Sequence, residues 1–417
     1  MKIAFFTETY YPELNGVSVS LDFVKKQLER KGHEVFIFAP KVRGYQNFDD
    51  HVIHLSTVRV INSEPKQRLV LPIPNATFRK MMSLKFDVIH SHGGGFSSLV
   101  GYQLALIKGY PFVLTYHTYI EKYTHYFFVK NSLVTGAIAR QGSKFMCNLS
   151  DIVVVPTKKM KKVLEKYGVK KEIQVVPNPI DLTMFKKGRG GFLHQKLKLP
   201  KESIILLTAS RLGKEKNLDF LIKSFALVAR ELPFARLVLV GDGPERERLE
   251  TLAAELGLEK TVILTGYIDT KQMPLVYSDA DIFLFASTSE TQGMVIPEAA
   301  ACGLPIVAVR DEAFSDLVVD DYNGYLVSEN RKKFAAKLTF LIKNQQKRDQ
   351  FGKNSVRLVN KIFDVDYAVK NLEAVYQKAI ATRRQTPRLS SRFQVGVRKS
   401  VGLLRYLKEL NQMLSRR

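Results

Sequence analysis

The sequence has little cysteine, no long apolar run and too few acidic residues to balance its basic ones. Its two cysteines, Cys147 and Cys302, lie in apolar surroundings and cannot form a disulfide framework, so we expect buried thiols in a reducing compartment. No window offers the ~20 apolar residues that a membrane-spanning helix needs, because even residues 293–309 contain Glu298 and two prolines. The apolar run at residues 3–6 is too short for a signal peptide. These absences predict a cytoplasmic protein, soluble or bound to a membrane surface.

Basic residues outnumber acidic residues by a wide margin. The chain has 64 lysines and arginines against 40 aspartates and glutamates, which gives a formal net charge of +24. Such a charge indicates anionic partners: anionic lipids, nucleic acids or phosphorylated ligands. A length of 417 residues, with 45% apolar and 25% charged residues, fits a globular protein of two domains.

The first half of the chain alternates between apolar strands and helices. A predicted strand at residues 3–6 is followed by a loop containing Gly16, a helix from about 18 to 31 and a second strand. This order predicts a parallel, Rossmann-like domain over residues 1–176. Gly16 would let the backbone approach a ligand at the start of the helix, although a plain turn explains it equally well.

Polar side chains follow two later strands of this domain. His90 and His92 have a spacing that could bind zinc, but no third ligand stands out, so we expect no metal there. His117 follows the next strand and opens an aromatic stretch. A packed aromatic helix explains the rings, but His117, Glu121 and His125 would then line one face at positions i, i+4 and i+8. We therefore take as candidates for ligand binding His117, Tyr119, Glu121 and His125.

Residues 158–171 form a strongly basic predicted helix, with seven lysines and one glutamate. An apolar stripe at helical spacing allows two interpretations. Either the stripe packs inward and the lysines are solvated, or the helix lies on an anionic membrane, where each lysine adds about 1 kcal/mol. We favour the membrane contact, made by Lys158, Lys159, Lys161 and Lys162.

A segment punctuated by prolines, 177–181, is the predicted domain boundary. The second half repeats the strand and helix pattern, so residues 177–366 are predicted to form a second Rossmann-like domain. Arg211 and Lys216 lie in its first loop between strand and helix, where they would repel each other unless they share an anion. A diphosphate would supply two neighbouring charges, and both cations would stabilise it as it departs. Ordinary surface basicity is the alternative.

The stretch 287–299 carries the most informative pattern. It follows an apolar strand and leads into a helix whose first turn holds Glu298, with Glu290 in the preceding loop. Backbone N–H groups and the helix dipole at such a site attract anions, while carboxylates accept hydrogen bonds from hydroxyls. The combination suggests a ligand with both sugar and phosphate, such as a nucleotide sugar. In the alternative interpretation, Glu290 is a solvated loop charge and Glu298 merely complements the dipole.

Taken together, these motifs resemble those of a known family, the retaining family-4 glycosyltransferases. The motifs that match its carboxy-terminal domain are Arg211 with Lys216, Gly241-x-Gly243-Pro244, Glu290-x7-Glu298 and Ala301-x-Gly303-Leu304-Pro305. The resemblance extends through Gly16 and covers roughly residues 1–382. Within the family, two sets of residues are similar to bacterial 1,2-diacylglycerol glucosyltransferases: Thr115-Tyr116-His117-Thr118 with Glu121, Tyr123 and His125-Tyr126, and Ser289-Glu290-Thr291-Gln292-Gly293.

This resemblance implies an α/β protein with the GT-B fold, in which two Rossmann-like domains with parallel sheets face each other across a cleft. It implies that residues 367–382 form a helix that crosses back to the first domain. It also implies that no metal is bound through an Asp-x-Asp motif. Asp279-x-Asp281 has that spacing but precedes a buried strand, so we interpret it as structural.

By position, the resemblance also assigns roles to single residues. Arg211 and Lys216 would contact the diphosphate, Glu298 the ribose hydroxyls and Glu290 the sugar hydroxyls. His117 would lie beside the reacting carbon and the acceptor, which makes His117, Arg211, Lys216 and Glu290 the catalytic candidates. Further donor contacts are expected from Gly16, Gly241, Gln292, Gly293, Met294 and Val295. The implied mechanism is front-face transfer, in which a leaving phosphate oxygen takes the acceptor proton.

Residues 383–417 contain ten basic residues and one acid, with apolar residues recurring every three or four positions. A helix of this kind lies in a membrane interface without spanning it, through cations such as Arg398, Lys399 and Arg405. Docking on the protein itself, or disorder, is the alternative.

The resemblance and the charge together predict an enzyme on the inner face of the cell membrane. It would move a hexose, glucose from UDP-glucose, onto diacylglycerol or monoglycosyl-diacylglycerol. Its predicted partners are the nucleotide sugar, the lipid acceptor and the anionic membrane surface, with no bound metal. Transfer to a soluble or polyprenyl-linked acceptor is an alternative. A nucleic-acid-binding protein without enzymatic activity is a remote one, because it leaves Glu290, Glu298 and His117 without a function.

Overall fold

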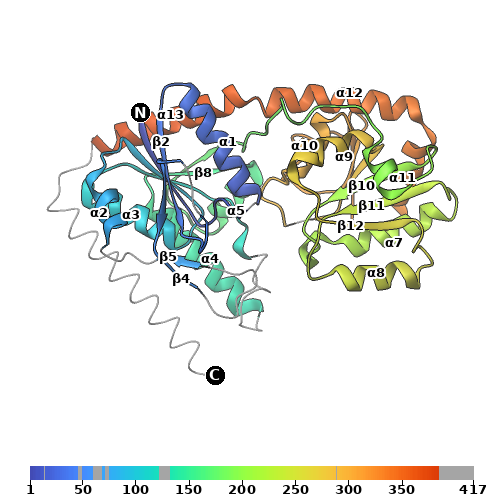
Figure 1. Cartoon of the computed structure of the whole chain (residues 1–417), viewed down its shortest axis with the longest axis horizontal. Coiled ribbons are helices and arrows are strands. Elements are labelled where there is room, and N and C mark those ends of the chain that lie inside the picture. Colours follow the sequence, from blue (N-terminus) through green and yellow to red (C-terminus); the bar gives the residue numbers. More distant parts are fainter. Residues whose placement is uncertain are drawn as a thin grey trace.

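Two lobes, each built on a parallel β-sheet, make up the molecule (Figure 1). The computed structural model describes residues 1–13, 15–45, 49–59, 68–70, 75–121, 132–287 and 289–384. Within these ranges the first lobe, the N-terminal domain, contains a seven-stranded sheet and the second, the C-terminal domain, a six-stranded sheet. The predicted α/β fold class with two Rossmann-like domains is therefore confirmed.

All neighbouring strands of the N-terminal sheet run parallel. In spatial order they are β3 (Val52–Leu55), β2 (Glu34–Pro40), β1 (Lys2–Thr7), β6 (Val88–His92), β7 (Phe112–Thr115), β8 (Ile152–Val155) and β9 (Glu172–Val175). A separate antiparallel pair consists of β4 (Thr57–Arg59) and β5 (Arg68–Val70). Every residue of β1 after Lys2 is buried, because helices cover both faces of the sheet, and this explains why the strand reads as one apolar run.

The helices of this domain pack on the two faces according to the alternation of the strand residues. They are α1 (Gly16–Arg30), α2 (Ala76–Ser83), α3 (Phe96–Lys108), α4 (Ser132–Leu149) and α5 (Lys158–Lys166). Ile3 and Phe5 of β1 pack against α1, whereas Ala4 and Phe6 point to the opposite face and pack with residues of α2 and α3. Asn15 begins α1, since its side chain accepts hydrogen bonds from two backbone N–H groups of the first turn.

The C-terminal sheet is also parallel throughout. Its spatial order is β12 (Val262–Gly266), β11 (Ala235–Val240), β10 (Ile204–Ala209), β13 (Ile282–Phe285), β14 (Ile306–Val309) and β15 (Gly324–Val327). One face is covered by α7 (Leu218–Ala229), α8 (Arg246–Glu255) and α11 (Arg331–Lys343), and the other by α6 (Phe192–Leu197), α9 (Met273–Asp279), α10 (Val295–Ala301) and α12 (Gln345–Ile362). Short 3-10 turns, η2 (Lys214–Lys216) and η3 (Thr270–Gln272), precede α7 and α9.

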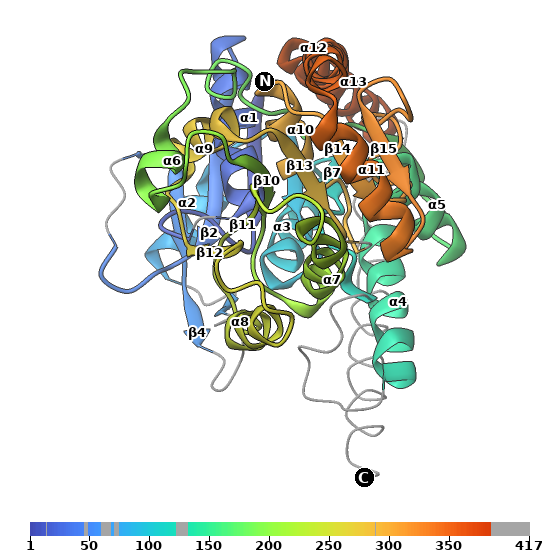
Figure 2. The ribbon, with the colours of Figure 1, turned by 90° about the vertical axis from the view of Figure 1, so that its right-hand side faces the viewer.

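The last described helix returns to the first domain. α13 (Val365–Arg384) follows α12, and the two helices extend along one edge of both lobes (Figures 1 and 2). Val369, Leu372 and Tyr376 of α13 lie in the same buried cluster as Ile3 and Phe5. Arg383 contacts the carboxylate of Asp151 at 3.3 Å, so the helix continues past the predicted limit of residue 382. Residues 385–417, which include most of the predicted basic tail, lie outside the described residues.

Candidate active site

The starts of two helices, one from each domain, meet at the domain interface. Gly16 is the first residue of α1, and a methyl group placed on it would lie 4.0 Å from the Cγ atom of Met294. Met294 is the N-terminal cap of α10, and no side chain caps this helix by a hydrogen bond. The structure therefore brings together two segments, Gly16 and 292–295, that the sequence assigned to the same donor site from different domains.

Lys216 and Glu290 form an ion pair in this region. The Nζ atom of Lys216 lies 2.6 Å from Oε1 of Glu290, and the two side chains are only 15% and 14% exposed. Lys216 ends η2 after strand β10, whereas Glu290 lies in the loop after the adjacent strand β13, so neighbouring strands place both groups at one edge of the sheet. The predicted phosphate contact and the predicted sugar contact are thus immediate neighbours.

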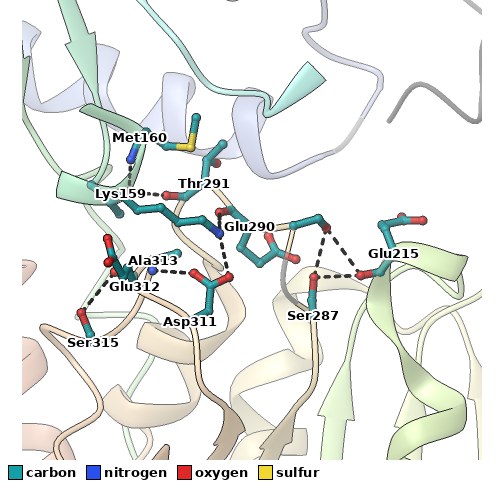
Figure 3. Close-up of polar contacts among 12 residues, drawn as sticks. Lys159, Met160, Glu215, Ser287, Glu290, Thr291, Asp311, Glu312, Ala313 and Ser315 are labelled. Carbon is teal, nitrogen blue, oxygen red and sulfur yellow. Dashed lines mark hydrogen bonds and ion pairs between the residues drawn. The ribbon is translucent and has the colours of Figure 1, made fainter. Parts of the chain in front are cut away.

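Arg211 has a carboxylate partner that the sequence analysis missed. Its Nη2 atom donates to Oε1 of Glu215 at 2.9 Å, with the arginine side chain 39% exposed and the glutamate 3% exposed. The main-chain oxygen of Glu215 in turn accepts a hydrogen bond from Ser287 (Figure 3). Arg211 and Lys216 therefore do not need a shared anion to offset their repulsion, and that part of the electrostatic argument was wrong. The i, i+4 spacing of Arg211 and Glu215 was the available signal.

Glu298 lies in the first turn of α10 and is held by a residue that the sequence did not indicate. The hydroxyl of Tyr277, on α9, donates to Oε2 of Glu298 at 2.8 Å. Burial raises the pKa of Glu298 to about 7, although the hydrogen bond from Tyr277 acts in the opposite direction. Tyr277 is fully buried among apolar residues, so its spacing in the sequence is that of an ordinary core position.

Gly241 has a packing reason for being a glycine. Its φ is +127°, and a Cβ atom there would lie 1.9 Å from the carbonyl oxygen of Ser210. Gly243 makes a similar close approach, since its Cβ would lie 2.6 Å from the carbonyl oxygen of Leu212. The glycine turn after β11 therefore packs closely against the backbone on both sides of Arg211 and supports this loop.

Three histidines of the N-terminal domain stand in a row beside the interface. Nε2 of His117 lies 3.0 Å from Nδ1 of His92 and the two rings stack, whereas the rings of His92 and His90 are tilted, with centroids 4.1 Å apart. Both ring nitrogens of His90 are engaged, one by the Thr115 hydroxyl at 2.6 Å and the other by Tyr376 at 2.7 Å. These bonds give His90 a structural role and leave it no nitrogen for a metal ion.

Burial keeps these rings neutral at ordinary pH. It lowers the pKa of His90 to about 3 and that of His117 to about 4, and it lowers the pKa of His92 well below its usual value, with nearby histidines adding to the shifts of His90 and His92. His117 is thus a neutral imidazole, able to accept or donate one hydrogen bond according to its tautomer.

The loop that contains Glu290 is attached to the N-terminal domain by hydrogen bonds. Thr291 donates from its hydroxyl to the main-chain oxygen of His117 at 2.9 Å, and its own carbonyl accepts from Thr157 at 2.8 Å. The side-chain amide of Gln292 exchanges two hydrogen bonds of 2.9 Å with the backbone of Asn178 at the domain boundary. The side chain of Gln292 is therefore structural, and only its main chain remains a candidate for donor binding.

Sequence comparisons assign the chain to a family. Residues 14–184 match the model of "Glycosyltransferase Family 4", and residues 191–357 match that of "Glycosyl transferases group 1". The alpha-monoglucosyldiacylglycerol synthase of Acholeplasma laidlawii is 30% identical over 392 residues, which cover 90% of this chain and 96% of the relative. The chain belongs to glycosyltransferase family 4.

Other relatives of this glycosyltransferase differ in their named substrates. The alpha-monoglucosyldiacylglycerol synthase of Streptococcus pneumoniae is 31% identical over 336 residues, covering 78% of this chain and 75% of the relative. The D-inositol 3-phosphate glycosyltransferase of Acidothermus cellulolyticus is 26% identical over 412 residues, covering 91% of this chain and 90% of the relative.

Solved structures support the GT-B fold. Sucrose-phosphate synthase from Thermosynechococcus elongatus superposes with a TM-score of 0.73 at 21% identity, covering 91% of this chain and 99% of that chain. HepE from Anabaena, crystallised with UDP-glucose, superposes with a TM-score of 0.71 at 20% identity, and the alignment covers 91% of this chain and 100% of HepE.

The glycosyltransferase uses its Asp-x-Asp sequence for packing. Asp279 accepts hydrogen bonds from the backbone N–H groups of Gly191, Leu193 and His194 and so holds the start of α6. Asp281 accepts from the N–H of Ile205 at 2.8 Å. Over the ranges that the structure describes, no group of three or more His, Cys, Asp or Glu residues is arranged to hold a metal ion.

The predicted acceptor residues are placed differently from the expected helix face. His117 and Tyr119 lie in an irregular segment rather than in a helix, so the i, i+4 argument for His117 and Glu121 was wrong. The carboxylate of Glu121 is held by Tyr167 at 2.5 Å and by Arg140 at 2.6 Å. His125 lies outside the described residues.

Three lysines of α5 contact the other domain. Lys158, Lys159 and Lys162 form ion pairs with Asp316, Asp311 and Glu312 of the C-terminal domain, at 3.2, 2.7 and 3.1 Å. The side chain of Lys159 is only 13% exposed, so it is not available to a membrane in this arrangement. Lys161 belongs to the same helix, whereas Arg398, Lys399 and Arg405 lie outside the described residues. No helix in the described part of the chain is long and apolar enough to cross a bilayer.

Proposed function

We propose that this glycosyltransferase transfers glucose from UDP-glucose to diacylglycerol, or to monoglycosyl-diacylglycerol, with retention of configuration. The observation that carries the proposal is the pairing of Lys216 with Glu290 beside the place where Met294 faces Gly16. This arrangement sets a phosphate-binding cation and a carboxylate that can accept bonds from sugar hydroxyls next to each other, at the meeting point of two helix starts. The two diacylglycerol-glucosylating relatives, at 30% and 31% identity, supply the substrate class.

Each candidate residue has a role in the donor complex. Arg211 and Lys216 bind the diphosphate, Glu298 accepts from the ribose hydroxyls, and Glu290 accepts from the glucose hydroxyls. Main-chain groups of Gln292, Gly293, Met294 and Val295 approach the donor from one domain and Gly16 from the other. Gly241 acts indirectly, by supporting the loop of Arg211. The donor is a co-substrate, and the proposal requires no metal ion.

The reaction proceeds on one face of the glucose ring. The bond between the anomeric carbon and the UDP oxygen breaks, the acceptor hydroxyl oxygen bonds to the same face, and the acceptor proton passes to the departing phosphate oxygen. Arg211 and Lys216 stabilise the negative charge that develops on the diphosphate. Because its pKa is lowered to about 4, His117 is a weak base, so it orients the acceptor through a hydrogen bond and leaves the phosphate as the base.

We propose that the enzyme works at the inner face of the cell membrane as a peripheral protein. The net charge of +24 and the eight basic residues in 385–417 favour an anionic surface. Among the α5 lysines, Lys161 remains a candidate for this contact, together with Arg398, Lys399 and Arg405. Lys158 and Lys162, which are more than half exposed, remain candidates only if their ion pairs with the C-terminal domain open.

Mass spectrometry of the products tests the proposal. The full chain is incubated with diacylglycerol in anionic vesicles and with a panel of nucleotide sugars, with Glu290→Ala as the inactive control. A monoglucosylated lipid formed from UDP-glucose, with an α-linkage by NMR, is expected. Failure of all nucleotide sugars to modify diacylglycerol, and then monoglycosyl-diacylglycerol in the same vesicles, would refute it.

A soluble acceptor is the second candidate, because the inositol-phosphate relative aligns over 91% of the chain. Adding inositol 3-phosphate and a polyprenyl phosphate to the same panel distinguishes this candidate from the diacylglycerol proposal. A soluble product formed without vesicles would favour this second candidate, and loss of all activity without lipid would favour the first.

A further inference from the structure

A buried ion pair joins the two domains next to the loop of Glu290. The Nζ atom of Lys159, on α5, lies 2.7 Å from Oδ2 of Asp311, and the side chains are 13% and 7% exposed. The same ammonium donates to the main-chain oxygen of Glu290 at 3.2 Å (Figure 3). One lysine of the N-terminal domain thus bonds both to a carboxylate and to the Glu290 loop of the other domain.

The lysine is held in this position by its helix. Thr157 caps α5, and its hydroxyl also donates to the carbonyl of Thr291, which ties the helix start to the same loop. Met160, the next residue after Lys159, is fully buried and fixes the first turn against the sheet. A cation in the first turn of a helix is disfavoured by the helix dipole. The carboxylate of Asp311 offsets that cost.

The carboxylate is equally well fixed. Oδ1 of Asp311 accepts a hydrogen bond of 2.7 Å from the backbone N–H of Ala313, which leaves Oδ2 directed at Lys159. A buried ion pair whose partners are both held by further hydrogen bonds is rigid. Removing one partner leaves the other charge buried without compensation. Geometry of this kind suits a contact that must hold a loop at a fixed distance from another domain.

We propose that Lys159 and Asp311 are positioning residues for glucose transfer: they hold the Glu290 loop against the N-terminal domain. Thr291 in this loop already bonds to the main-chain oxygen of His117, so the loop links the sugar-binding carboxylate to the acceptor side. Lys159 and Asp311 keep Glu290 at the correct distance from His117 when the domains are together. The inference rests on the proposed function in so far as Glu290 binds the transferred sugar.

Two neighbouring ion pairs provide a matched control. Lys158 with Asp316 and Lys162 with Glu312 join the same helix to the same acidic segment, but all four side chains are between 60% and 72% exposed. In the part of the chain that the structure describes, neither pair is bonded to the Glu290 loop. Exposed ion pairs of this kind contribute little to the stability of a protein. Asp311→Asn and Asp316→Asn therefore make the same chemical change at a buried and at an exposed site of one interface.

The test compares turnover with the binding of two ligands. For Asp311→Asn we expect kcat to fall at least about tenfold, because small displacements of a binding group are costly to a reaction. Binding of UDP, measured by calorimetry, should stay within about twofold, since UDP lacks the sugar that Glu290 would hold. The affinity for UDP-glucose should fall relative to that for UDP. Asp316→Asn should stay within about twofold of the wild type in all three measurements.

Lys159→Met should reproduce the effect of Asp311→Asn, and the double variant should be no worse than either single one, because the two residues act as a unit. The proposal is overturned if Asp311→Asn behaves like Asp316→Asn. It is also overturned if Asp311→Asn weakens UDP binding and lowers the urea unfolding midpoint in parallel with turnover, which indicates general damage.

A different result would contradict the proposed function without contradicting the role of Lys159 and Asp311. If the wild-type enzyme binds UDP-glucose but glucosylates no lipid, the proposed acceptor is wrong. The comparison of UDP-glucose with UDP affinity in Asp311→Asn and Asp316→Asn still decides the role of the buried pair.

Discussion

Lys216 donates a hydrogen bond of 2.6 Å to the carboxylate of Glu290, a residue 74 positions later in the chain. The two groups come from the loops after adjacent parallel strands, so the sheet itself brings them together. The ammonium is thereby held next to the carboxylate. If Lys216 binds the diphosphate, as we propose, the attached sugar is expected within reach of Glu290.

Glu290→Ala should lower kcat at least about a hundredfold, as expected when a group that binds the reacting sugar is removed. The change also leaves Lys216 without this carboxylate, so Glu290→Gln, which preserves the side-chain volume, should be measured beside it. Turnover of UDP-glucose and the circular dichroism spectrum are the two readouts. Near-normal turnover with an intact fold would rule out the role of Glu290.

Donor binding should depend on pH through Glu298. Its pKa of about 7 means that the carboxylate gains a proton as the pH falls through neutrality, and a protonated group accepts poorly from ribose hydroxyls. The KM for UDP-glucose should therefore rise as the pH drops, by up to about fivefold from pH 7 to pH 6. Glu298→Gln should have a raised KM that no longer varies over this range. A wild-type KM that is flat between pH 8 and pH 6 would exclude this assignment.

The buried histidines should make the fold sensitive to acid. The pKa values of His90 and His117, about 3 and about 4, lie below the unfolded value of about 6.5, so the unfolded chain binds protons more readily. The free energy of unfolding should therefore decrease as the pH falls from about 6.5 toward 4. Urea unfolding as a function of pH measures this slope. Replacing His90 by Gln should reduce the slope, at the expense of some stability at pH 7.

Gly241→Ala should destabilise the protein by more than about 3 kcal/mol, because the new Cβ would meet the carbonyl oxygen of Ser210 at 1.9 Å. Gly257→Ala is the control: its φ is also positive, at +68°, but nothing lies within 4 Å of the added methyl group. That variant should lose only about 1–2 kcal/mol from backbone strain. Urea midpoints compare the two, and equal losses would show that contact with the Arg211 loop does not matter.

Removal of residues 385–417, which contain eight basic residues, should weaken binding to anionic vesicles at least about a hundredfold, since each basic residue near the surface contributes about 1 kcal/mol. The cut follows Arg384 because Arg383 contacts Asp151 and belongs to the folded part of the chain. Turnover in detergent should change little. Vesicle flotation that is the same with and without these residues would assign membrane binding to another surface.

The fold could be predicted because parallel strands buried on both faces read as short apolar runs, and helices separate them in order. The position of Glu290 and Lys216 was predictable for the same reason, since the ends of adjacent strands meet. The partners Glu215 and Tyr277 were missed: Glu215 lies between two lysines in a charged loop, and Tyr277 has the spacing of a core residue. The Lys159 contact could not be found, because Asp311 lies 152 positions away and in another domain.

Local pattern also misled where a helix was assumed. The spacing of His117 and Glu121 suits a helical face, but the backbone after β7 is irregular, and Glu121 turns instead to Tyr167 and Arg140. Likewise, the lysines of α5 look like a membrane-facing row until the acidic segment 311–316 is placed opposite them. In both cases the position of the side chains is determined by a long-range contact, which the local sequence does not reveal.

The return of α13 has a consequence for biosynthesis. Tyr376 is fully buried in the first domain and bonds to His90. The ribosome makes this domain before the second one. Because Tyr376 lies near the end of the described chain, however, the core of the first domain is complete only once almost all the chain has emerged. A nascent fragment ending at the domain boundary would leave an open apolar groove along β1 and His90 without this partner. The domain translated second can therefore finish folding first.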